Sequence, residues 1–174
     1  MNIVGVDPGI KGGLSCLELS TKGLHRLARA VPMPTLKVGK SMVLDTRELD
    51  DFFPAGDAFV FIENVHSYPK QGVVSTFQFG RIFGNVEATM QLFAGVSRIE
   101  YVQPQAWKAE FDLIGEDKVA SIEKATQLFG PKGYWRMEGP RGGSMIEANS
   151  GVAEATLIAE YGRRYMEELV NVWH

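Results

Sequence analysis

Two carboxylate residues stand at the ends of apolar runs. Asp7 closes a short apolar run and is followed at once by Pro8 and Gly9, which favour a tight turn. Glu63 closes the run 58–62, whose apolar residues suit a strand buried on both faces. Unpaired carboxylates there are costly, so we expect a cation, and oxygen ligands suit Mg²⁺ or Mn²⁺ better than zinc. The alternatives are an acid that only caps the turn, or acids that meet a lysine or a helix N-terminus.

A third acid lies on the last predicted helix, residues 151–169. Glu154 is at helical spacing from Leu157 and Ile158, so its side chain is expected to face the buried side of the helix. The three acids come from the start, middle and end of the chain. A mixed sheet covered by a C-terminal helix would bring them together.

The elements that must position these acids are predicted from hydrophobic periodicity. Three consecutive strands, followed by alternating helices and strands, indicate an α/β fold with a mixed sheet over a single domain, residues 1–174. Residues 35–43 are expected to form a mobile, basic connection, and the glycine-rich stretch 130–148 looks least ordered. The expected strands are 3–7, 14–19, 24–31, 58–63 and 97–102, and the expected helices are 45–53, 73–93, 118–129 and 151–169, with a short helical turn at Trp107.

The long predicted helix 73–93 contains Gly80 and Gly84, four residues apart. Each glycine costs up to about 1 kcal/mol relative to alanine in a helix, so close packing against another helix is a plausible reason for both. If the chain forms a dimer, this helix is our candidate for its interface. Its expected apolar stripe is Phe77, Phe83, Val86, Met90 and Phe93.

Composition limits the class of protein. The chain has 174 residues, 45% of them hydrophobic and 22% charged, which is typical of a soluble globular protein, and no run is long enough to span a membrane. The single cysteine, Cys16, excludes an intrachain disulfide and suits a reducing, cytoplasmic interior. A net charge of −3 argues against a general nucleic-acid binder, so any DNA surface must be a local patch. Candidates for that patch, with ordinary surface charge as the default, are Lys37, Lys40, Lys132, Arg136 and Arg141.

Five short motifs in order resemble the RuvC-type Holliday junction resolvases, and most of all their phage-encoded relatives. The resemblance covers nearly the whole chain, and its specificity lies in the order of the motifs. It implies an RNase H-like α/β fold with a five-stranded mixed sheet, a homodimer that nicks branched DNA in symmetric pairs, and two divalent metal ions per site, without a small-molecule cofactor or a membrane partner. The motifs are Gly5-Val-Asp7-Pro-Gly9, Phe61-Ile-Glu63-Asn-Val65, Pro104-Gln-Ala-Trp-Lys108, Asp117-Lys118-Val-Ala-Ser-Ile122 and Gly151-Val-Ala-Glu154-Ala-Thr-Leu-Ile-Ala159.

The resemblance assigns roles to five residues. Asp7, Glu63 and Glu154 match metal-binding acids, and Lys108 and Lys118 match basic residues near the scissile phosphate. Two metals about 4 Å apart can activate a water and stabilise a leaving oxygen, and a lysine can offset charge that develops on the phosphate. For both lysines the alternative is a solvated charge on a helix.

The sequence departs from the family pattern where a fourth acid is expected. The relatives carry an aspartate just before the glycine of the C-terminal helix, whereas this chain has Ala148, Asn149 and Ser150 there. Ser150 is a good helix N-cap, and Asn149 can offer a neutral oxygen ligand. Three explanations stay open: a weak natural ligand, an acid changed on purpose, or a protein that binds junctions without cutting.

The loop after Glu63 and the start of the long helix are the candidate DNA contacts. Aromatic side chains there could stack at an opened junction, and cationic ones could meet phosphates. Phe77 has the alternative of a place in the core or in a dimer interface. The candidates are Tyr68, Lys70, Gln71, Phe77 and Arg81.

Two rival functions remain. An actin-like or sugar-kinase-like ATPase also places an Asp and a Gly after its first strand. However, such proteins repeat the fold in two domains and carry a second Asp-Gly loop, which this chain lacks. The other rival is a catalytically weak or inactive junction-binding protein, which the residues Asn149 and Ser150 favour.

Overall fold

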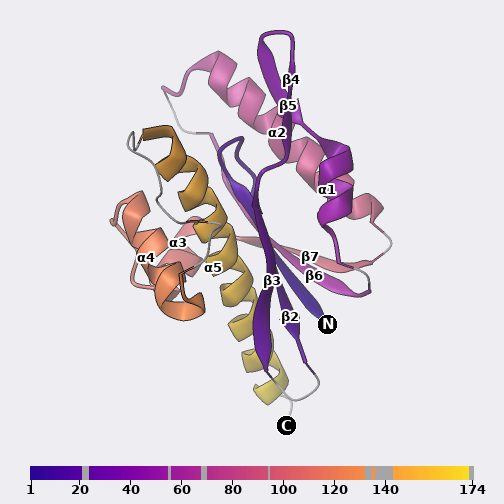
Figure 1. The fold of residues 1–174 in the computed structure, drawn as a ribbon, viewed down its shortest axis with the longest axis vertical. Helices are drawn as coiled ribbons and strands as arrows, with labels where there is room; N and C mark the ends of the chain where they lie inside the picture. Colours follow the sequence, from indigo (N-terminus) through magenta and orange to yellow (C-terminus); the bar gives the residue numbers. More distant parts are fainter. Residues whose placement is uncertain are drawn as a thin grey trace.

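The computed structural model describes residues 1–20, 24–54, 56–67, 70–93, 95–131, 135 and 143–172, and within the last range the side chains of 150–169. Its centre is a five-stranded sheet in the order β3-β2-β1-β6-β7 (Figure 1). The strands are β1 (Asn2–Asp7), β2 (Gly13–Leu19), β3 (His25–Pro32), β6 (Ala58–Glu63) and β7 (Val96–Val102).

The sheet is mixed, as expected. β1 pairs antiparallel with β2 and parallel with β6, and β6 runs parallel to β7. Val6 and Ile62 are partners in the β1–β6 register, so the next residues, Asp7 and Glu63, lie at the same edge of the sheet. Side chains alternate between faces along a strand, so both acids lie on the face that buries Ile3.

Helices cover both faces of the sheet (Figure 1). One face packs on α3 (Pro104–Glu110), α4 (Lys118–Phe129) and α5 (Gly143–Val172), around a core that includes Trp107. The other face packs on α1 (Thr46–Phe52) and α2 (Val73–Leu92), around a core that includes Ile82. None of the described helices is long and apolar enough to cross a membrane.

Helix α5 lies directly on strand β1, because β1 has a glycine at the crossing. A Cβ atom on Gly5 would overlap the carbonyl oxygen of Ala155 and the backbone nitrogen of Ala159. The absence of a side chain there lets the helix backbone contact the strand. This close approach places the segment of α5 that carries Glu154 beside β1.

Two expectations about local structure are wrong. Residues 35–43 are not a mobile connection, because β4 (Thr35–Val38) and β5 (Ser41–Leu44) pair as an antiparallel hairpin. The final helix begins at Gly143 rather than at Gly151, so Ser150 lies inside the helix and is not its N-cap.

The expected stripe on α2 is only partly right. Val86 and Met90 are buried, together with Ile82, but 72% of Phe77 is exposed. Gly80 and Gly84 do not mark a close contact within the chain, because a Cβ atom on either would meet nothing within 4 Å. The remaining elements follow their predicted ranges to within about two residues.

Candidate active site

The three acids come together from three elements. Asp7 is the last residue of β1, Glu63 is the last residue of β6, and Glu154 projects from α5 beside them. All three side chains are partly buried. Part of the site is a hollow of about 190 Å³, which is lined by Asp7, Gly9, Lys11, Gly12, Lys118, Ser150, Gly151 and Glu154.

Crowding of these acids changes their titration. Burial, followed by the negative charges of Glu154 and Glu63, raises the pKa of Asp7 to about 8, although the backbone N–H of Gly9 donates to its Oδ1 at 3.3 Å. Burial also raises the pKa values of Glu63 and Glu154. Carboxylates that raise one another's pKa in a partly buried site favour the binding of a positive charge.

Two side chains that the sequence analysis missed hold the glutamates in place. The indole Nε1 of Trp107 donates to Oε1 of Glu63 at 2.8 Å, and the hydroxyl of Ser121 donates to Oε1 of Glu154 at 3.3 Å. Both donors are buried. In the sequence these residues are only a tryptophan in a short helix and a serine on the apolar face of α4, and neither position predicts a carboxylate partner.

Three lysines surround the acids. The charges of Lys108 and Lys118 lower the pKa of Glu154 against the larger effect of burial, which places both ammonium groups near it. Lys118 begins α4, whose N-cap Asp117 accepts from the backbone N–H of Val119 at 2.9 Å. Lys11 lines the hollow too, from the turn between β1 and β2, and the sequence analysis did not single it out.

The residues present fit a hard divalent cation. The donors are carboxylate oxygens, with no thiolate or imidazole among the residues that line the hollow, and this set suits Mg²⁺ or Mn²⁺. In the described part of the chain, no three His, Cys, Asp or Glu side chains stand close enough to hold one ion as they are. The carboxylates would therefore have to move closer together around an ion, whose positive charge would offset the repulsion between them.

The place of the expected fourth acid is occupied by small residues. Ser150 is buried and lines the hollow, one helical turn before Glu154. Next to it, a Cβ atom on Gly151 would overlap the carbonyl oxygen of Lys11, so this position has no room for a side chain. The side chain of Asn149 lies outside the described residues.

The candidate DNA contacts lie along the start of α2. Lys70 and Gln71 are exposed just before the helix, and Phe77 and Arg81 are exposed on it, so Phe77 is not a core residue. In Figure 1 the start of α2 and the start of α5 lie at the same end of the molecule. Tyr68, Lys132, Arg136 and Arg141 lie outside the described residues.

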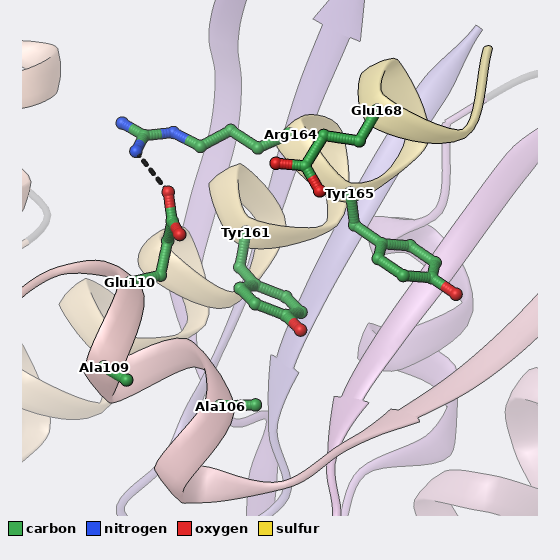
Figure 2. A pocket seen from close by; sticks show the side chains of 7 residues that line it. All are labelled: Ala106, Ala109, Glu110, Tyr161, Arg164, Tyr165 and Glu168. Atoms are coloured by element: carbon green, nitrogen blue, oxygen red, sulfur yellow. Dashed lines mark hydrogen bonds and ion pairs between the residues drawn. The ribbon is translucent and has the colours of Figure 1, made fainter. Parts of the chain in front are cut away.

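A second groove, of about 380 Å³, lies between α3 and the part of α5 that carries Tyr161, Tyr165 and Glu168 (Figure 2). The rings of Tyr161 and Tyr165 lie parallel along it, with centroids 6.4 Å apart. Across the groove, Nη1 of Arg164 contacts Oε1 of Glu110 at 2.6 Å. This ion pair joins α5 to α3, the helix that carries Trp107 and Lys108.

No protein-family model and no curated protein matches the chain. Solved structures do match. Thermus thermophilus RuvC in complex with a Holliday junction substrate is 18% identical, with 94% of this chain and 98% of that chain covered and a TM-score of 0.51. Another structure of Thermus thermophilus RuvC is 20% identical over the same shares, with a TM-score of 0.52.

The fold is RNase H-like. At these identities the likeness establishes the fold and leaves the chemistry to the chain's own residues. The expected α/β fold with a five-stranded mixed sheet is confirmed.

Proposed function

We propose that the chain is a divalent-metal-dependent endonuclease that nicks four-way and other branched DNA in pairs, as a homodimer. The observation that carries this proposal is the convergence of Asp7, Glu63 and Glu154. Burial raises the pKa of each, the charge of Glu154 adds to the rise for Asp7 and Glu63, and Lys108 and Lys118 lower the pKa of Glu154. The RNase H-like fold supports it, and so does the Holliday junction bound by one structural neighbour. A phage origin and a cytoplasmic location stay predictions.

Each residue of the site has a task in this reaction. Asp7, Glu63 and Glu154 would hold the ions, and a bound divalent ion supplies Lewis-acid chemistry at a phosphodiester. Trp107 and Ser121 keep the two glutamates oriented, which matters because catalytic groups act only in a narrow range of geometry. The lysines hold phosphate oxygens and offset the negative charge that develops on them.

A junction-binding protein that does not cut is the second candidate. It is favoured by Ser150, a neutral residue in the hollow, and by the separation of the described acids. It predicts strong binding to a junction without strand breaks in any metal.

A labelled synthetic four-way junction distinguishes the two candidates. The proposed nuclease makes nicks in two strands of like polarity, at symmetric positions, in Mg²⁺ or Mn²⁺ and not in EDTA. A linear duplex with the sequence of one arm is the control and should stay intact. Binding without nicks in either metal would support the second candidate, and equal cutting of the duplex would contradict structure selectivity.

A further inference from the structure

The β4–β5 hairpin stands apart from the five-stranded sheet. Its two strands of four residues pair only with each other. In Figure 1 the hairpin projects beyond the sheet, at the end of the molecule where α2 and α5 start. The acids belong to this end, because Glu154 lies near the start of the described side chains of α5 and Asp7 precedes the β1–β2 turn.

The base of the hairpin is fixed to the body of the protein. Leu44 is buried in the core between the sheet and α2. The side-chain amide of Gln78 on α2 donates to the carbonyl oxygen of Met42 at 3.3 Å. The backbone N–H of Asp45 donates to the carbonyl of Pro34 at 2.9 Å and closes the base of the hairpin itself. These contacts fix the base of the hairpin against the core and α2, so the hairpin projects from the protein in a defined direction.

The tip combines positive charge with exposed apolar surface. Leu36 and Val38 are 38% and 56% exposed, and Lys37 and Lys40 are exposed beside them. Residues 35–44 contain no acid. Neither lysine forms an ion pair with any residue that the structure describes. Both charges are available to a partner.

We propose that this hairpin is an arm that grips a duplex arm of the bound DNA. A two-stranded ribbon fits the major groove, where lysines reach phosphates and apolar side chains contact thymine methyl groups. Two exposed lysines in a segment without an acid are complementary to a polyanion such as the DNA backbone. This inference rests on the proposed function, and it adds a DNA contact outside the acidic site.

The test is the salt dependence of binding to a labelled four-way junction by Lys37→Gln/Lys40→Gln. Loss of two phosphate contacts per hairpin lowers the magnitude of the slope of log K against log salt by about 2 for each hairpin that contacts the junction. We expect junction affinity at low salt to fall about tenfold or more.

The matched control is Arg26→Gln/Lys124→Gln, which removes two positive charges from β3 and α4. Both cations sit in surface ion pairs, worth about 0–1 kcal/mol each, so this variant should fold and keep the wild-type slope. If the hairpin variant also keeps the wild-type affinity and slope, the hairpin does not contact DNA and the inference is overturned.

Two further outcomes separate the inference from its rivals. Leu36→Ser/Val38→Ser should weaken junction binding without changing the mass measured by light scattering. If the variant instead dissociates a dimer, while the dimer that remains binds the junction with unchanged affinity, the hairpin is a protein interface and the proposed DNA contact is refuted. If the wild-type protein binds no junction, both the proposed function and the hairpin contact are refuted. If the wild type cuts the junction and the lysine variant binds it like the wild type, only the hairpin contact is refuted.

Discussion

At the scale of single residues, the site is a set of partly buried acids, and the charges of Glu154 and Glu63 oppose the ionisation of Asp7. The sequence revealed Asp7 and Glu63 because each ends an apolar strand, where a carboxylate is costly. It did not reveal Trp107 and Ser121, because their roles depend on which carboxylate each one meets across the fold. Lys11 was missed for the same reason.

The raised pKa of Asp7 predicts a pH-dependent stability. Its pKa is about 8 in the folded, metal-free protein against an ordinary value of 3.8, so between these values the folded state binds more protons than the unfolded state. The free energy of unfolding must therefore fall as pH rises through this window. In Asp7→Asn the fall should be smaller, although Glu63 and Glu154 still contribute to it.

Thermal unfolding in EDTA at pH 5 and pH 8 measures this effect. The wild type should lose more of its melting temperature than Asp7→Asn, and Mg²⁺ should restore the wild type at pH 8 more than the variant. Equal pH dependence in the two proteins would contradict the account of crowded acids.

The neutral residue in the hollow predicts a gain of function. Ser150 lies one helical turn before Glu154, so Ser150→Asp adds a carboxylate on the same side of α5. We expect this variant to cut a junction about tenfold faster, because changes around a metal alter activity by about 10–100-fold. Asn149→Asp should gain less, since residue 149 is not one turn from Glu154.

Single-turnover cutting in Mn²⁺ compares these two variants, with circular dichroism to show that each one folds. If both fold and neither exceeds the wild type, the site needs no fourth acid, and the account of a missing ligand is wrong.

At the scale of elements, the periodic helices and long strands were predictable, but their contacts were not. The strand ending at Glu63 and the helix Lys118–Phe129 follow their predicted ranges. The hairpin 35–44 was missed because each of its strands has only four residues and two prolines precede them. The start of α5 was not predicted because it falls in a glycine-rich stretch, where the composition suggests a loop and no helical periodicity is visible.

The contact of α5 with β1 predicts a strong effect of Gly5→Ala. The new methyl group would overlap the backbone of α5, so the helix must move or the strand must bend. We expect the free energy of unfolding to fall by at least about 1–3 kcal/mol, as for other overpacked cores. Movement of α5 would also separate Glu154 from Asp7 and slow cutting.

Urea unfolding measures the loss, with Gly72→Ala as the control. Gly72 precedes α2, and a Cβ atom there meets only the Ser75 hydroxyl, at 3.7 Å. Gly72 is the N-cap of α2, where alanine is less favoured than glycine, so this variant should lose no more than about 1 kcal/mol. Wild-type stability in Gly5→Ala would show that α5 does not lie on β1 as described.

At the scale of the whole molecule, the exposed surface of α2 indicates a partner. Val73, Val74 and Phe77 are 84%, 80% and 72% exposed, and Gly80 and Gly84 have open space above them. A symmetric junction needs two sites, so a two-fold dimer through α2 stays our prediction. The sequence suggested that Gly80 and Gly84 form a packing surface. In the described part of the chain, no other element packs on these two glycines.

Gly80→Leu/Gly84→Leu tests this assembly. Both leucines have room in a single chain, and the helix should gain about 1 kcal/mol per glycine replaced, but a helix packed against the glycines would be pushed away. We expect light scattering to show a monomer at micromolar concentration. Glu123→Leu/Gln127→Leu, at the same spacing on exposed positions of α4, should leave the dimer intact. A wild-type protein that is monomeric with and without DNA would refute the dimer.

The most direct test of the central claim is the single-turnover nicking rate of a labelled four-way junction, measured with and without Mg²⁺ for the wild type and Asp7→Asn. Asp7→Asn removes an acid whose ionisation is opposed by burial and by the charges of Glu154 and Glu63, so the fold should survive the change. We predict metal-dependent nicks by the wild type and at least about a hundredfold slower nicking by Asp7→Asn, with junction affinity nearly unchanged. Nicking by Asp7→Asn at the wild-type rate, or wild-type nicking that continues in EDTA, would contradict the account.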